Sequence, residues 1–170
     1  MAILELYTFP NKVLSQKCED VEVVDDKVRK LLDDMLETMY HNKGVGLACP
    51  QVGILKSIIV IDDKVTEDGV PGEHPMYMVN PKIVEKSEEM VISNEGCLSV
   101  PGQCAEVERH ESVTVEYLDY HGKPQRLKAE GFLAIIIQHE TDHLSGTLYI
   151  DKISRLKRNM IIKRLEKLKA

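Results

Sequence analysis

The chain has 170 residues, of which 43% are hydrophobic and 29% are charged. This length and apolar content fit one domain with a substantial core, and they exclude a disordered chain and a fibrous repeat. The apolar runs are far shorter than the roughly 20 residues of a membrane span, and the first ten residues lack the basic start of a signal peptide. We therefore expect one domain over residues 1–170, in the cytosol and away from membranes.

Charge is unevenly distributed along the chain. The net charge is −6, but residues 151–170 hold eight Lys or Arg and two acidic residues, a local charge of +6 that leaves −12 on residues 1–150. The acidic body argues against a general binder of DNA, whereas the basic end predicts a local polyanionic partner. The alternative is an ordinary solvated helix face.

The helices are predicted from apolar spacing. Residues 25–43 repeat apolar side chains every three or four positions, with Asp25 or Asp26 as a cap and Gly44 as the end. A second helix is expected over 132–145, closed by Gly146. A third begins after Ser154 and carries a narrow apolar stripe of Leu156, Met160, Ile161, Leu165 and Leu168.

Short strand-like runs separate these helices. They cover residues 57–61, 76–79, 83–86, 113–117 and 125–129, with a surface loop at 62–75 and a hairpin turn at 119–123. A helix, then strands, then helices is the order of an α+β fold with a mostly antiparallel sheet. The four cysteines, in a chain with no export signal, argue against a disulfide framework: Cys18, Cys49, Cys97 and Cys104.

The second helix carries the sequence HETDH at 139–143. Residues four apart share a helix face, so His139 and His143 can reach one cation, and Glu140 can act as general base toward a water molecule on it. Two histidines on an exposed helix are the alternative. The apolar run at 132–137 argues for burial instead, where unpaired His and Glu cost several kcal/mol. Asp142 can orient a neighbouring ligand.

A third ligand must come from elsewhere. The extended motif HExxHxxGxxH fails because Tyr149 stands where its third His belongs, and Glu166 lies in the basic segment, a poor place for a ligand. Cys97 is the better candidate, between Gly96 and a turn signal at 101–102. Two His and one Cys with an open water position form an accepted catalytic set.

A third motif, GVGLACPQ at 44–51, follows the first predicted helix. It is no phosphate loop, because no Lys–Ser/Thr follows and no strand precedes it. Its small residues would let a substrate backbone approach closely, and Gln51 offers an amide donor. The alternative is a tight helix–strand loop.

In this order, the three motifs resemble those of the peptide deformylase family: GxGxAAxQ, EGCLS and HExDH. The resemblance covers essentially the whole chain, and the basic final helix looks like that of the bacterial type I enzymes. It implies antiparallel sheets around a central metal-binding helix. It also implies removal of the formyl group, as formate, from the N-terminal formyl-methionine of newly synthesised polypeptides.

The resemblance also implies roles for individual residues. Cys97, His139 and His143 would hold one divalent ion, physiologically Fe²⁺, with Zn²⁺, Ni²⁺ or Co²⁺ as alternatives. Glu140 would transfer the proton, while the Gln51 amide and the Leu98 backbone N–H would stabilise the oxyanion. Gly46 would pair with the substrate backbone, and Val45, Phe132 and Ile136 would form the methionine pocket. Glu95 and Arg109 would form an ion pair near the metal. The basic helix at 151–170 would have the ribosome as its partner.

Two residues depart from the family pattern. Cys49 replaces the second Ala of GxGxAAxQ and is interpreted as a core substitution, whereas Cys104 stands where related enzymes often carry Arg.

Another metal-dependent amidase or small peptidase would share the water chemistry but use a different pocket. A structural metal site is disfavoured because such sites are closed by four protein ligands and would leave Glu140 without a task.

Overall fold

The computed structural model describes residues 2–66, 68 and 70–169, so both ends of the predicted domain and two positions of the predicted loop at 62–75 lie outside the described residues. The helices are α1 (Asp26–His41), α2 (Gly131–Leu144) and α3 (Arg155–Lys169), with short 3₁₀ turns η1 (Lys12–Ser15), η2 (Cys49–Val52) and η3 (Tyr149–Lys152). The strands are β1 (Gly46–Ala48), β2 (Ile58–Ile61), β3 (Met76–Lys86), β4 (Met90–Cys97), β5 (Val100–His110), β6 (Ser112–Leu118) and β7 (Pro124–Glu130).

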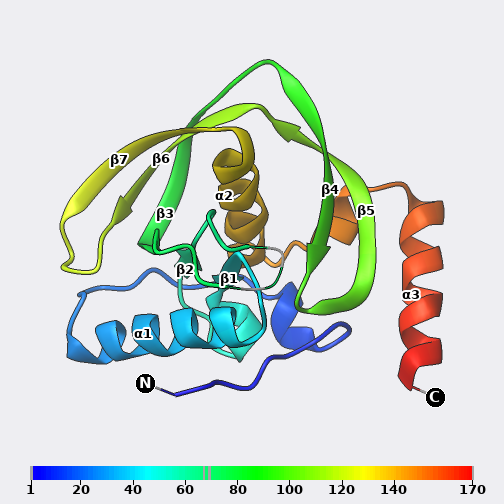
Figure 1. Ribbon diagram of the computed structural model, residues 1–170, viewed down its shortest axis with the longest axis horizontal. Helices are drawn as coiled ribbons and strands as arrows, with labels where there is room; N and C mark the ends of the chain where they lie inside the picture. Colours follow the sequence, from blue (N-terminus) through cyan, green and yellow to red (C-terminus); the bar gives the residue numbers. More distant parts are fainter. Residues whose placement is uncertain (1, 67, 69, 170) are drawn as a thin grey trace.

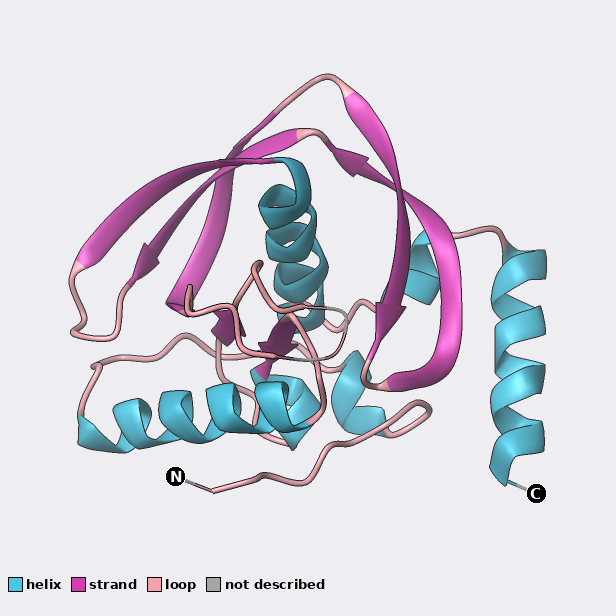
Figure 2. Cartoon of the chain, in the orientation of Figure 1, coloured by secondary structure: helices cyan, strands magenta, loops and turns pink. Residues whose placement is uncertain are grey.

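The strands form antiparallel sheets around α2. In the described part of the chain, one sheet has the order β1-β2-β3-β6-β7, and a second pairs β4 with β5. Figure 1 shows α2 between β3, β6 and β7 on one side and β4 and β5 on the other, and Figure 2 shows the same arrangement by element type. The predicted α+β class is confirmed.

The larger sheet is covered on both faces at β2, whose four residues are all buried. Successive side chains of a strand point to opposite faces. Alternate residues of β2 therefore enter two core clusters, one packed against α2 and containing Cys18, the other packed against α1 and containing Cys49. Each fully buried aliphatic side chain stabilises the fold by about 1.5–3 kcal/mol. The burial of Cys49 agrees with a core substitution.

The hairpin of β4 and β5 was not predicted, because its apolar pattern is broken: Met90 and Ile92 are exposed, whereas the charged Glu95 and Arg109 are buried. Along β5, Val107 and Arg109 are buried while Glu106 and Glu108 are exposed. The predicted turn at 101–102 is wrong, since both residues lie inside β5. The turn falls directly after Cys97, which pairs with Val100.

Backbone geometry explains two further differences. The predicted strands 76–79 and 83–86 are one strand, β3, in which Asn80 adopts a φ of 52° and its side chain exchanges hydrogen bonds with the Val21 backbone at 2.7 and 2.8 Å. The predicted end of the first helix at Gly44 is also wrong, because α1 ends at His41 and Lys43 carries the positive φ of 59°. The caps at Asp25 and Gly146 are confirmed.

Helix α3 begins after Ser154, whose hydroxyl accepts a hydrogen bond from the Lys157 backbone N–H at 3.3 Å. Of the predicted stripe, Ile161 and Leu165 are buried, but Leu156, Met160 and Leu168 are exposed. The helix therefore touches the core along one narrow line, in the cluster that contains residues of β5 and η3. No helix in the described residues is long and apolar enough to cross a membrane.

Candidate active site

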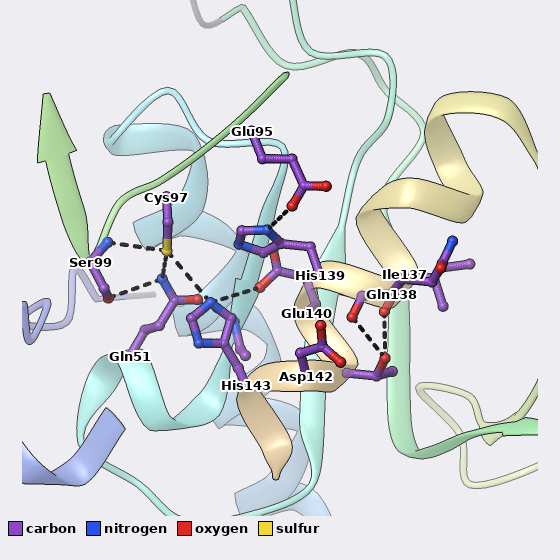
Figure 3. A network of polar contacts seen from close by, with 12 residues as sticks. Gln51, Glu95, Cys97, Ser99, Ile137, Gln138, His139, Glu140, Asp142 and His143 are labelled. Carbon is purple, nitrogen blue, oxygen red and sulfur yellow. Dashed lines mark hydrogen bonds and ion pairs between the residues drawn. The ribbon is translucent and has the colours of Figure 1, made fainter. Parts of the chain in front are cut away.

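Three donor side chains from two elements meet beside α2. His139 and His143 are buried on α2 and Cys97 ends β4, and their ligand atoms all lie within 4.8 Å of one another. The Cys97 Sγ to His143 Nε2 distance is 3.5 Å (Figure 3). Bond lengths of about 2.3 Å to sulfur and 2.1 Å to nitrogen place two tetrahedral ligands about 3.6 Å apart. The donors therefore fit a single cation in both chemistry and spacing.

A buried ionic network lies behind the histidines. The Glu95 carboxylate contacts His139 Nδ1 at 2.8 Å and accepts two hydrogen bonds from the Arg109 guanidinium at 2.6 and 2.7 Å. Arg109 also donates to Asp142 at 2.7 Å. A partner on one imidazole nitrogen fixes the ring and leaves the other nitrogen free to bind. Burial opposes the charge of Glu95, but Arg109 and His139 outweigh it and lower its pKa to about 2.

The two imidazoles have opposite electrostatic environments. Burial opposes a charged His139, but Cys97, Glu140 and Glu95 outweigh burial and raise its pKa well above the usual value. Burial and the neighbouring His139 lower the pKa of His143, which keeps that ring neutral. The groups around His139 thus favour positive charge, and His143 has a lone pair available. Both properties suit a bound cation.

Glu140 lies next to this cluster. Its Oε1 is 4.0 Å from His143 Nε2 and has no hydrogen-bond partner among the described residues. Burial raises the pKa of this carboxyl to about 7. The β1 backbone approaches it closely, because a Cβ added to Gly46 would lie 2.5 Å from Glu140 Oε2. Glu140 is thus a confined carboxyl able to exchange a proton near neutral pH.

Gln51 reaches the cluster from η2. Its Nε2 donates to Ser99 Oγ at 3.1 Å and contacts Cys97 Sγ at 3.4 Å (Figure 3). Its Oε1 accepts from the Ala48 backbone N–H at 2.9 Å. Ser99 in turn donates its hydroxyl to the Tyr7 carbonyl at 2.7 Å, and its backbone N–H points to the same sulfur. The amide and the sulfur are therefore held in a fixed relation.

A cavity of about 410 Å³ opens onto these groups. The predicted substrate residues and oxyanion donors all line it, namely Val45, Gly46, Gln51, Leu98, Phe132 and Ile136, together with Cys97, His139 and Glu140. Phe132 is 54% exposed and forms part of the rim. The predicted neighbours Glu95, Arg109 and Asp142 form the network behind the histidines. All the predicted site residues thus converge on one place.

Several residues of this site were not singled out from the sequence. Ile135 and Lys43 line the cavity, and Ser99 binds the Gln51 amide. The Tyr149 ring stacks on His139 with centroids 6.0 Å apart, and its buried hydroxyl has no partner among the described residues. Only Ser99 lies inside a motif, so the others depend on tertiary packing that the sequence does not display.

Comparisons with known proteins agree with this geometry. Residues 3–159 match the family model described as polypeptide deformylase. The chain is 54% identical to the peptide deformylase of Rickettsia akari over 99% of this chain and 98% of that protein, and 52% identical to that of Pelagibacter ubique over 100% and 97%. A peptide deformylase from Ehrlichia chaffeensis, solved in complex with actinonin, is 44% identical with a TM-score of 0.90, covering 98% of both chains.

The match therefore extends over nearly the whole chain in both sequence and fold. The three motifs at 44–51, 95–99 and 139–143 all fall inside the matched segment. The chain belongs to the polypeptide deformylase family.

Proposed function

We propose that the cluster of Cys97, His139 and His143, together with Glu140, is the catalytic centre of this metal-dependent deformylase. Its substrate is the N-terminal formyl-methionine of newly made polypeptides, and formate is released. The observation that carries the proposal is the donor set beside a Glu140 oxygen that has no hydrogen-bond partner among the described residues, with Cys97, His139 and Glu140 on the wall of one cavity. Residues 1–170 would act as one catalytic domain, in the cytosol.

Cys97, His139 and His143 would hold one divalent ion. A thiolate with two imidazoles suits Fe²⁺, which we propose as the native ion, and also Zn²⁺, Ni²⁺ and Co²⁺. When bound, such an ion supplies Lewis acidity, which polarises the formyl carbonyl and lowers the pKa of water. Glu95 would keep the His139 ring oriented through its 2.8 Å contact with Nδ1.

Proton transfer is assigned to Glu140. It would take a proton from the attacking water and deliver it to the departing amine of methionine. Burial raises the pKa of this carboxyl, which makes it a stronger base toward water. Gln51 and the Leu98 backbone N–H would donate hydrogen bonds to the formyl oxygen as it gains negative charge, and one such donor is typically worth about 3–4 kcal/mol.

The apolar cavity wall supports a methionine side chain. Val45, Phe132, Ile135 and Ile136 line it, and Ile136 is almost fully buried. An unbranched thioether fills such irregular apolar space well. Gly46 lines the same cavity and would pair with the substrate backbone, and a larger residue there would collide with Glu140.

Formate release from formyl-Met-Ala-Ser by anaerobically prepared protein tests this assignment. Glu140→Ala should keep its metal and lose nearly all turnover, whereas Glu108→Ala, an exposed glutamate of β5, should behave as wild type. Cys97→Ala should lose both metal and activity. Retention of more than about a tenth of kcat by Glu140→Ala would assign proton transfer to another residue. Full metal occupancy in Cys97→Ala would contradict the ligand set.

We further propose that the basic segment at 151–170, which contains α3, binds the ribosome. Its cationic side chains Lys157, Lys163, Arg164 and Lys167 are exposed. Contacts with ribosomal RNA release counterions, so binding should weaken steeply with salt. Deleting the helix would remove the buried Ile161 and Leu165 and uncover the residues of β5 and η3 on which they pack, so neutralisation is the better perturbation.

Co-sedimentation with ribosomes is the test of this partner. The double variant Lys163→Gln/Lys167→Gln should pellet less than wild type at low salt. Its rate of formate release from free formylated peptide is measured separately and compared with that of wild type. Neutralising Lys86 and Lys128, two exposed lysines outside α3, is the matched control. Equal pelleting of all three proteins would identify the basic helix as an ordinary solvated face.

A further inference from the structure

Lys43 stands at the mouth of the active-site cavity. The cavity wall runs from exposed residues, among them Lys43 and Asn94, to the buried Gln51, His139 and Glu140. None of the described residues forms a hydrogen bond or ion pair with the Lys43 ammonium. The mouth therefore carries a cation that is free to meet a ligand.

The backbone holds this lysine in place. Its N–H donates to the Tyr40 carbonyl at 3.0 Å, and the following N–H of Gly44 donates to Met39 at 2.9 Å, which closes the last turn of α1. Lys43 has a φ of 59°, in the left-handed region that glycine adopts with less strain. Backbone geometry alone therefore does not account for a lysine at this position.

The surroundings leave the charge of Lys43 uncompensated. Across the mouth, the wall offers the uncharged side chains of Ser93, Asn94 and Gln103. The carboxylate of Glu95 is already paired with Arg109, and Glu140 is buried at the other end of the cavity. The cavity entrance therefore carries a positive charge, although the chain as a whole has a net charge of −6.

The distance from the reacting group to Lys43 fits a short peptide. Gly46, which approaches Glu140, is three positions after Lys43 in the chain, so the Cα atoms of Lys43 and Gly46 are at most about 11 Å apart. An extended peptide whose formyl group lies at Glu140 covers this span with the residues that follow methionine. Building on the function proposed above, we infer that Lys43 is a specificity-determining residue that favours formylated peptides with an acidic side chain at the second or third position.

The test compares two substrates of equal size, formyl-Met-Ala-Asp-amide and formyl-Met-Ala-Asn-amide, at low ionic strength. The terminal amide removes the competing carboxylate, and the same pair with the acidic residue at position two locates the contact. The measured quantity is the ratio of kcat/KM for the Asp peptide to that for the Asn peptide. Wild type should exceed Lys43→Gln in this ratio by about 2- to 5-fold, the range of an exposed ion pair.

Charge reversal and salt sharpen the test. Lys43→Glu should lower the ratio below that of Lys43→Gln, and added salt should reduce the wild-type ratio toward that of Lys43→Gln. Lys27→Gln, in α1 and outside the cavity wall, changes net charge equally and should keep the wild-type ratio.

Two failures are distinguishable. Equal ratios in wild type, Lys43→Gln and Lys43→Glu at both positions would overturn the inference. A wild-type protein that releases no formate from the Asn peptide would instead overturn the proposed function.

Discussion

Gly46→Ala tests how tightly the active site is packed around its proposed base. The new Cβ would lie 2.5 Å from Glu140 Oε2, 2.9 Å from its Cγ and 3.0 Å from its Cδ. Ordinary contact begins near 3.4 Å, so the carboxyl oxygen must move by about 0.9 Å. Glu140 is only 5% exposed, and three of its atoms are crowded at once, so the whole side chain must shift.

A displacement of this size has a predictable kinetic cost. Misplacing a reacting group by about 1 Å can lower the rate about 10²-fold. We therefore expect Gly46→Ala to lower kcat on formyl-Met-Ala-Ser about 100-fold while metal content stays at the wild-type level, because no ligand is touched. Steady-state formate release and elemental analysis measure the two quantities.

A control separates local displacement from loss of stability. Gly122→Ala places a side chain at a φ of 78° in the hairpin turn between β6 and β7 and should destabilise the fold without affecting kcat. If Gly46→Ala kept more than about a third of wild-type kcat, the close approach of β1 to Glu140 would not limit catalysis. The same conclusion would follow if Gly122→Ala lowered kcat as much as Gly46→Ala does.

Three other perturbations follow from the contacts. Gln51→Leu should lower kcat about 10²–10³-fold with little change in KM, and a defect confined to KM would place the amide in ground-state binding. Tyr149→Phe removes a buried hydroxyl without a partner in the described structure and should raise the free energy of unfolding in urea by about 1 kcal/mol, whereas a clear loss would reveal a partner. Burial opposes the charge of Asp62, but the Tyr40 hydroxyl at 2.6 Å and backbone N–H groups lower its pKa. Its stabilisation is complete above the unfolded pKa of about 4 and is lost below it, so the stability difference between wild type and Asp62→Asn should shrink as the pH falls through that range, and a constant difference would exclude ionisation as its source.

The donor set could be predicted because its geometry is largely local. His139 and His143 share a face on any helix, and Glu140 must lie beside them. Cys97 followed from donor chemistry and from its motif, although the turn that presents it was placed three residues too late. What the motifs could not supply is the packing that brings β4 against α2.

Residues set by tertiary packing escaped prediction. Lys43 has no periodic or motif signal, and it reaches the cavity only because α1 ends two residues before it. In the sequence, Tyr149 only marks the absence of a third histidine after the HETDH motif, and its stacking on His139 depends on how η3 folds back. The β4–β5 hairpin shows the same limit, because charged residues, Glu95 and Arg109, occupy buried positions where a strand pattern requires apolar ones.

The burial of Cys18 and Cys49 on opposite faces of the larger sheet gives the chain two internal reporters of local opening. Burial raises the pKa of Cys18 to about 11 and that of Cys49 to about 12, so neither reacts readily as a thiolate in the native state. Once the accessible Cys97 and Cys104 have been blocked, the labelling rate of each buried thiol would measure how often its own core cluster opens. The order in which the two thiols react would then show whether the core cluster packed against α1 or the one packed against α2 opens first.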